Sequence, residues 1–178
     1  TNPLFIDSQA GIPAAQPLSR LSEFVEVLRP FGAQAFATDI AQSGAGIGPL
    51  AIVERADGTY IASGGPNRGW LYRIPHGGSG DLQPFMELDL PVFDLAYDAR
   101  GGLWATTGGG ELLQLDADSG AILGRYGDGF TQALALNPTT GEIYLSSGNG
   151  VEIFDPVGHH VRHLDRKSTR LNSSHLVI

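Results

Sequence analysis

The amino-acid sequence predicts an all-β fold built from a repeated unit of four short antiparallel strands. The clearest copy spans residues 92–126, where segments rich in Val, Leu, Trp, Tyr and Thr alternate with turns that contain Gly or Asp. Its four expected strands are Val92–Tyr97, Gly102–Thr107, Glu111–Leu115 and Ala121–Tyr126. The composition agrees, because 25 of the 178 residues are Gly and only 17% are charged, as expected of many tight turns between short strands.

The same four-strand unit occurs once before and once after this copy. The earlier copy reads PLAIVE, TYIAS, WLYRI and PFMEL, and the later one reads TQALAL, EIYLSS, VEIF and HVRHL. Tyr60, Trp104 and Tyr144 are expected at the same place in the second strand, 44 and 40 residues apart. A four-stranded sheet with two apolar faces is not stable alone, so each unit must pack between neighbours.

A period of about 40 to 45 residues with four strands per unit is typical of a β-propeller. We therefore predict a partial β-propeller of about three four-stranded antiparallel blades within residues 21–165. The expected blades are about 49–90, 91–129 and 130–165, and residues 21–40 could supply strands of a preceding blade. The candidates there are Ser22–Leu28, for which a short amphipathic helix over 18–28 is the alternative, and Ala35–Ile40. Since propellers usually close with four to eight blades, we interpret the chain as a fragment.

The two ends of the sequence differ from the repeat. Residues 1–20 contain three prolines among small residues, which predicts a linker or an irregular lead-in. Residues 166–178, RKSTRLNSSHLVI, hold the only lysine and have no strand pattern. This segment resembles a translated vector or adaptor sequence, so we interpret it as a non-native tail and leave it out of the fold prediction. A native disordered tail is the alternative.

Composition excludes several classes of function. The formal net charge of −8 argues against nucleic-acid binding, because contact with phosphates needs a basic surface. The sequence has no run of about 18 apolar residues, so no membrane span is expected. The absence of cysteine excludes disulfides, zinc–thiolate clusters and thiol catalysis. The expected partner is a protein or a small-molecule ligand.

Particular segments resemble known propeller blades. DLAYDARGGLWATT and LALNPTTGEIYLSS are similar to the second-strand signature of NHL-type, streptogramin-lyase-like and gluconolactonase-like propellers. LDADSGAIL resembles a turn of quinoprotein-like and YVTN-type blades. The resemblance covers about residues 49–164. The sequence lacks the Gly-His and Trp-Asp pairs of WD repeats and the multi-Asp calcium loop of integrin-like blades.

Propeller geometry implies where a site would lie. The first strand of each blade is innermost, and the loops entering it share one end of the channel with the loops between the second and third strands. The polar residues expected at that end are Asn67, Arg68, Asp128, Gln132 and Asn149. Among these, Asp128, Gln132 and Asn149, with Asn67 from the neighbouring blade, carry the side-chain oxygens that Ca²⁺ prefers, although no cofactor is assured. The alternative is that all five are ordinary turn residues.

Other motifs have simpler interpretations. Asp116–Gly120 looks like a calcium loop but stands where a turn is required. On a strand, His160 and His163 would face opposite ways, and neither has an assignable carboxylate partner. Asp94 precedes the inner strand of the second blade, and a hydrogen bond to a neighbouring blade's backbone explains it best, with a functional role as the alternative. The glycine loop at 42–48 precedes a strand and lacks a P-loop lysine.

No catalytic residue can be assigned, because the serines lack a G-x-S-x-G elbow. We therefore expect a non-catalytic ligand-binding or protein-interaction module of a larger bacterial exported or surface protein, in an extracellular or periplasmic location. The alternative is a divalent-cation-dependent hydrolase or lyase resembling the gluconolactonase and streptogramin-lyase propellers. Those families place a Glu, Asn, Asp or His on inward positions of several blades, and this sequence offers no clear matching set.

Overall fold

The computed structural model describes residues 3, 6 and 33–165, and each element within 33–165 is a β-strand. The strands are β1 (Ile52–Glu54), β2 (Tyr60–Gly64), β3 (Trp70–Ile74), β4 (Pro84–Glu87), β5 (Asp94–Tyr97), β6 (Leu103–Thr106), β7 (Gly110–Leu115), β8 (Ile122–Leu136), β9 (Ile143–Ser147), β10 (Gly150–Phe154) and β11 (His160–Asp165). Within this part of the chain, no helix is long and apolar enough to cross a membrane.

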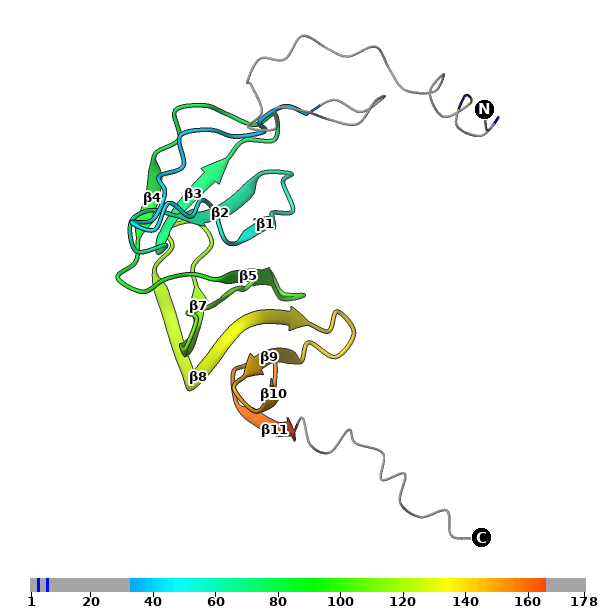
Figure 1. Ribbon diagram of the computed structural model, residues 1–178. Coiled ribbons are helices and arrows are strands. Elements are labelled where there is room, and N and C mark those ends of the chain that lie inside the picture. The colour runs from blue at the N-terminus through cyan, green and yellow to red at the C-terminus, as the bar shows by residue number, and fades with distance from the viewer. Residues whose placement is uncertain (1–2, 4–5, 7–32, 166–178) are drawn as a thin grey trace, which may run out of the picture.

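The strands form three stacked units, which we call blades 1 to 3. Blade 1 is the four-stranded antiparallel sheet β1–β4. Blade 2 consists of β5–β7 and the first part of β8, and blade 3 consists of the last part of β8 and β9–β11. Figure 1 shows blade 1 uppermost and blade 3 at the bottom. The predicted all-β class and the four-stranded antiparallel units are confirmed.

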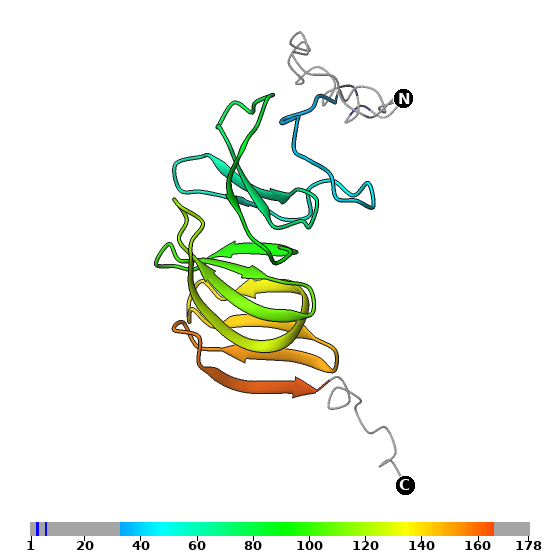
Figure 2. The same cartoon turned by 90° about the vertical axis from the view of Figure 1, so that its left-hand side faces the viewer.

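Blades 2 and 3 share one long strand where the sequence predicts two separate strands. The strands expected at 121–126 and 131–136 are parts of the 15-residue strand β8. Phe130 pairs with Gly110 of blade 2 and with Ser147 of blade 3, so one residue belongs to both ladders. Gly127 and Gly129 have φ of 58° and 72°, which lets the strand bend here without Cβ strain. The result is the seven-stranded ladder β5–β11 visible in Figure 2.

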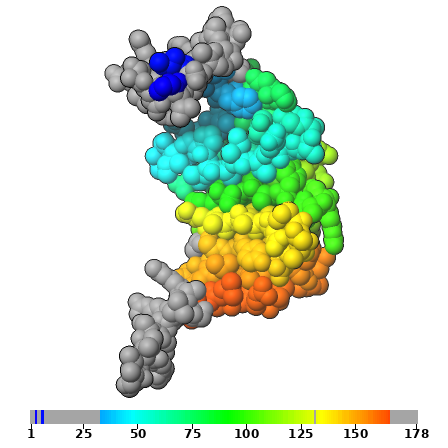
Figure 3. All heavy atoms as spheres, turned by 90° about the vertical axis from the view of Figure 1, so that its right-hand side faces the viewer, coloured from blue at the N-terminus to red at the C-terminus, as the bar shows by residue number. Residues whose placement is uncertain are grey.

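Two apolar layers hold the blades together. The layer between blades 1 and 2 is built around Ile61, Leu71, Leu103 and Leu113, all with 0% exposure. The layer between blades 2 and 3 contains Trp104, Leu112, Phe130, Ile143, Leu145 and Phe154. Trp104 is fully buried there, and its indole N–H donates to Asp98 Oδ2 at 2.9 Å. Seen from the side of Figure 3, the three blades form one continuous column.

The predicted alignment of the three aromatic residues is wrong at Tyr60. Trp104 pairs with Ala96, and Tyr144 pairs with Ala135. Each lies two residues after the residue whose carbonyl closes the preceding turn, which is Gly102 in blade 2 and Glu142 in blade 3. In blade 1 the turn is closed by the carbonyl of Thr59, so Tyr60 comes only one residue later and pairs with Glu54. Ile61 therefore occupies the position that Trp104 and Tyr144 have in blades 2 and 3. Because side chains alternate along a strand, this one-residue slip turns Tyr60 to the opposite face. Tyr60 therefore packs with the segment that precedes blade 1 instead of facing blade 2.

The strand expected at Ala35–Ile40 is not formed. Ala37 makes one isolated parallel bridge to Ser79, and Asp39 has a left-handed φ of 64° that interrupts an extended run. The segment nevertheless covers the face of blade 1 that is turned away from blade 2, because Ala37, Ile40 and Ala41 pack there against buried residues of the blade. The expectations for 1–20, Ser22–Leu28 and 166–178 concern residues outside the described ranges, apart from the isolated positions 3 and 6.

Candidate functional site

The loops between second and third strands lie against the connections that link one blade to the next. The N–H of Leu88 donates to the carbonyl of Gly69, and the N–H of Val92 donates to that of Arg68, both at 3.0 Å. One blade further on, the N–H of Gly109 donates to the carbonyl of Phe130 at 2.6 Å. The structure thus brings these two kinds of segment together along one end of the blades, as propeller geometry implies.

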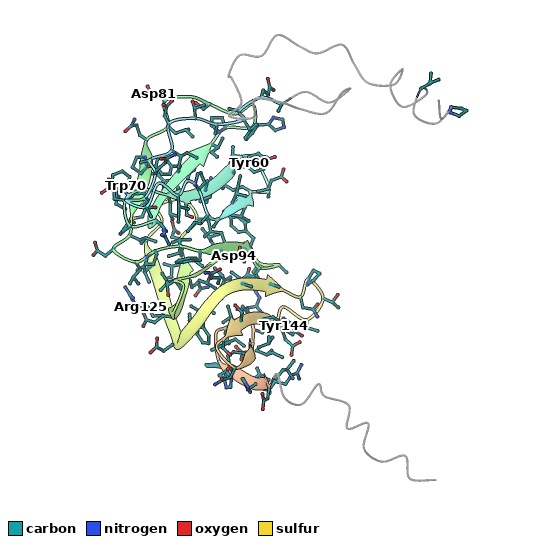
Figure 4. The ribbon with its side chains drawn as sticks, in the orientation of Figure 1. Tyr60, Trp70, Asp81, Asp94, Arg125 and Tyr144 are labelled. Atoms are coloured by element: carbon teal, nitrogen blue, oxygen red, sulfur yellow. The ribbon has the colours of Figure 1, made fainter. Side chains whose placement is uncertain are left out.

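Backbone groups of adjacent blades are joined near this end by side chains from inner positions. The hydroxyl of Ser63 donates to the carbonyl of Val92 at 2.9 Å, and the hydroxyl of Thr106 donates to that of Gln132 at 2.7 Å. Both hydroxyl-bearing residues are fully buried. The proposed role of Asp94 is confirmed, since its Oδ2 accepts from the N–H of Leu134 in the next blade at 2.9 Å. Figure 4 labels Asp94 at the middle of the stack. These contacts fix the positions of the loops that surround the candidate site.

Asn67 organises the loop of blade 1. Its amide Nδ2 donates to the carbonyl of Leu88 at 2.7 Å, and its Oδ1 accepts from the N–H of Gly69 at 3.0 Å. Both ends of the amide are therefore used within the protein. Asn67 holds the loop in place for its neighbour, Arg68.

Arg68 presents a cation with an unusual backbone. Its φ is 67°, a left-handed conformation that is uncommon for residues other than Gly, Asn and Asp. Arg68 is partly buried, and its guanidinium lies over the ring of Phe93, with 5.6 Å between Cζ and the ring centroid. Among residues 33–165, no carboxylate lies within ion-pair distance of Arg68, whereas Arg55, Arg73 and Arg125 each have one. Within residues 33–165, Arg68 is therefore a partly buried cation without a neutralising carboxylate at this end.

A cavity of about 440 Å³ opens beside this guanidinium. Its lining combines both loop types with the glycine loop that precedes blade 1: Ser43, Gly44, Ala45, Pro66, Asn67, Arg68, Pro91, Phe93 and Gly108. The N–H groups of Gly44 and Ala45 donate to no acceptor within the described part of the chain. The wall thus offers a guanidinium and two backbone donors beside apolar surface from Phe93 and two prolines.

The other predicted residues lie elsewhere. Asp128 is exposed, accepts the N–H of Gly129 at its Oδ1 and lines a second cavity. Gln132 is bonded through its backbone N–H and carbonyl, to Ser146 and Thr106. Asn149 is exposed in the turn between β9 and β10. Only Asn67 and Arg68 of the five candidates line the first cavity.

The prediction that His160 and His163 face opposite ways is wrong. Both rings also have a carboxylate partner, which could not be assigned from the sequence. His160 Nε2 lies 2.9 Å from Glu152 Oε2, and His163 Nδ1 lies 2.6 Å from Glu152 Oε1, so both rings contact one carboxylate. They share a side because the β10–β11 ladder has a bulge between Ile153 and Phe154, and a bulge inserts one extra residue into the alternation. Burial by itself would raise the pKa of Glu152, but the bonds from His160 and His163 outweigh it and lower that pKa.

The calcium-like segment Asp116–Gly120 is a turn, as predicted. Asp116 Oδ1 accepts the N–H of Ser119 at 2.7 Å and its hydroxyl at the same distance, and the N–H of Gly120 bonds the carbonyl of Asp116. These bonds lower the pKa of Asp116, most strongly through the Ser119 N–H. Within the described residues, no group of three or more His, Cys, Asp or Glu side chains is arranged to hold a metal ion.

Sequence reasoning missed Phe93 and the cavity-lining role of the glycine loop at 42–48. Phe93 lies just before β5 and is 25 residues from Arg68, and nothing in the sequence marks their contact. The glycine loop was recognised as a loop, but its position against blade 1 depends on the packing of Ala37 and Ile40. Three-dimensional packing alone brings these pieces to Arg68.

No protein-family model matches this sequence. No curated protein matches it. Solved structures do match: virginiamycin B lyase from Staphylococcus aureus has a TM-score of 0.51 at 18% identity, with 64% of this chain and 40% of that chain covered. A gluconolactonase from Xanthomonas campestris has a TM-score of 0.51 at 23% identity, covering 66% and 46%. YCF48 bound to the D1 peptide has a TM-score of 0.54 at 19% identity, covering 76% and 44%.

The chain is part of a β-propeller. With TM-scores of 0.51 to 0.54 at 18% to 23% identity, the likeness to these three structures is one of fold. The chain spans between 40% and 46% of their lengths. The resemblance of its blades to streptogramin-lyase-like and gluconolactonase-like propellers is therefore confirmed at the level of architecture. The cavity at Arg68 lies at a loop end of this propeller.

Proposed function

We propose that this propeller segment is a non-catalytic binding module that holds a small organic anion at Arg68. The observation that carries the proposal is the guanidinium of the partly buried Arg68 over Phe93, which has no carboxylate partner among residues 33–165 and borders a cavity of about 440 Å³. A guanidinium recognises carboxylates and phosphates through charge-assisted, often bidentate hydrogen bonds.

The backbone of Arg68 supports this proposal. A non-glycine residue in a sparsely populated φ/ψ region costs about 1–3 kcal/mol, and such residues cluster at functional sites. The conformation is maintained by the bond from the Arg68 N–H to the carbonyl of Gly65 and by the bond that its carbonyl accepts from Val92, each 3.0 Å. An asparagine or glycine would fill this turn at lower cost, so the arginine side chain has a use beyond forming the turn.

The remaining cavity wall favours an anion with an apolar, planar body. The N–H groups of Gly44 and Ala45 can add donors to an anionic group, since successive backbone N–H groups in turns form anion-binding concavities. Phe93, Pro66 and Pro91 supply apolar surface for the rest of the ligand. Propeller loops on a rigid stack of blades are suited to such binding without chemistry.

A titration with phenyl phosphate and benzoate tests the proposal, with backbone amide shifts of the ¹⁵N-labelled protein as the readout. We expect saturable shifts at Gly44, Ala45 and Gly108, and affinity at least about tenfold lower in Arg68→Gln, because a hydrogen bond to a charged group contributes about 1.5–3 kcal/mol. Arg100→Gln is the matched control, since Arg100 is exposed and lines a different cavity. Equal affinity of the native protein and Arg68→Gln would overturn the proposal.

A further inference from the structure

A second cavity, of about 560 Å³, lies between the outer parts of blades 2 and 3. It borders the bend of β8, near which Figure 4 labels Arg125. Its lining residues are Arg125, Tyr126, Gly127, Asp128, Phe130, Glu152, Phe154, Gly158, His159 and His160. It shares no lining residue with the Arg68 cavity, so what it binds is independent of the function proposed above.

Aromatic rings form much of this second cavity. Phe130 and Phe154 pack edge to face with centroids 5.4 Å apart, and the ring of His160 lies 5.2 Å from that of Phe154. Tyr126 completes the wall and is supported from behind by Trp104 at 5.5 Å. The two phenylalanines are each only 3% exposed, so packing holds their rings in place.

Two glycines allow the rings to come this close to the backbone. A Cβ at Gly127 would collide with the ring of Phe130, and a Cβ at Gly158 would collide with the ring of Tyr126. Both glycines also have positive φ, 58° and 89°, so a larger residue would be unfavourable for two reasons. The local sequence thus preserves an aromatic-walled space at this boundary.

The charge in the cavity is negative. The carboxylate of Glu152, with 18% of its side chain exposed, is bonded by His160 and His163, and these bonds favour its ionised form. Asp128 adds a second, exposed carboxylate. Arg125 also lines the cavity, but its guanidinium forms an ion pair with Glu111, with 2.6 Å between Nη1 and Oε2. Glu111 is not one of the residues that line the cavity. Net negative charge beside aromatic faces favours a cationic ligand.

We propose that this cavity binds a small organic cation of the quaternary-ammonium class, held against Tyr126 and His160 and neutralised by Glu152. Aromatic faces attract such cations through the ring quadrupole, and the attraction grows when the cation is desolvated. A metal ion fits the residues less well. Both oxygens of Glu152 already accept hydrogen bonds from histidines, and no cluster of three metal-ligating side chains occurs in the described residues.

The test compares choline with its neutral isostere 3,3-dimethyl-1-butanol, titrated into the native chain and followed by NMR. Choline is expected to shift the ring resonances of Tyr126 and His160 in a saturable manner. The isostere has the same shape without the charge, and we expect it to bind roughly 3-fold to 30-fold more weakly. Equal affinity for the two compounds, or choline shifts that leave Tyr126 and His160 unmoved, would overturn the proposal.

A variant provides an independent check. Glu152→Gln keeps the shape of the side chain but removes its charge, and we expect it to weaken choline binding severalfold while binding of the isostere stays the same. Glu87→Gln is the matched control, because Glu87 is an exposed carboxylate on β4 of blade 1, outside the cavity. Unchanged choline affinity in a folded Glu152→Gln would contradict the assignment. If this variant fails to fold, the comparison of choline with the isostere on the native chain still decides the question.

Discussion

Asp94 Oδ2 accepts a hydrogen bond from the backbone N–H of Leu134 at 2.9 Å, across the boundary between blades 2 and 3. The other oxygen, Oδ1, accepts the N–H of Leu95 at the same distance, so the carboxylate connects the two inner strands. Blade 1 has no carboxylate at the equivalent position, where Ala51 stands. There the hydroxyl of Ser63 contributes by bonding the carbonyl of Val92.

Removal of this contact should destabilise the blade boundary. Asp94→Ala leaves the N–H of Leu134 without its acceptor, and we expect a loss of about 1–3 kcal/mol in the free energy of unfolding. Asp94→Asn keeps an acceptor oxygen and should lose less. Urea denaturation of both variants measures the difference. Equal losses would mean that the carboxylate's charge, and not its acceptor geometry, holds the boundary.

The corrected register predicts different outcomes for two aromatic residues. Trp104 is fully buried between blades 2 and 3, so Trp104→Ala should cost about 3–5 kcal/mol. Tyr60 is only partly buried, on the face towards the preceding segment, so Tyr60→Ala should cost clearly less. In a Trp70→Phe background, Trp104 fluorescence should be that of a buried indole. A fully solvated emission spectrum would contradict the strand register described for β6.

Interpretation of residues 166–178 as a non-native tail gives a prediction for truncation. A chain ending at Asp165 should have the same free energy of unfolding within about 0.5 kcal/mol, as for segments that do not pack. Thermal denaturation of the two chains makes the comparison. A loss of several kcal/mol in the shorter chain would show that the tail contributes to the fold.

The lowered pKa of Glu152 predicts an acid-sensitive contact between β10 and β11. A carboxyl whose folded-state pKa lies below its ordinary value of about 4.3 contributes stability that is present above that value. This contribution is lost as the pH falls through the depressed folded-state pKa. The difference in melting temperature between native protein and Glu152→Gln should therefore shrink below about pH 4. A difference that stays constant down to pH 2 would show that Glu152 acts only through packing.

Much of the fold could be predicted because each blade follows local rules. Alternation of apolar residues and turns with Gly or Asp located the strands, since both signals act over a few residues. The bend within β8 could not be predicted, because Gly127 and Gly129 read as an ordinary loop until both neighbouring ladders are seen to include Phe130. The one-residue register shift at Tyr60 could not be predicted either. A change of one residue in the length of a turn decides which face of the sheet the following side chains take, and the sequence does not show that length.

The sites were less predictable than the strands. Asn67 and Arg68 could be proposed from the position of their loop, but the contact of Arg68 with Phe93 depends on how blades 1 and 2 stack. The partnership of Glu152 with His160 and His163 requires the bulge in β11, which has no clear sequence signal. The calcium site at Asp128, Gln132 and Asn149 stays a proposal that only a binding measurement can address.

We propose that the Arg68 cavity binds its anion directly, without a divalent cation. The measurement that tests it is the dissociation constant of phenyl phosphate for the native chain, determined by calorimetry once with EDTA and once with millimolar calcium. Binding through the Arg68 guanidinium predicts the same constant in both. Binding that appears only with calcium and disappears in Asp128→Ala would contradict the claim and favour the cation-dependent hydrolase or lyase.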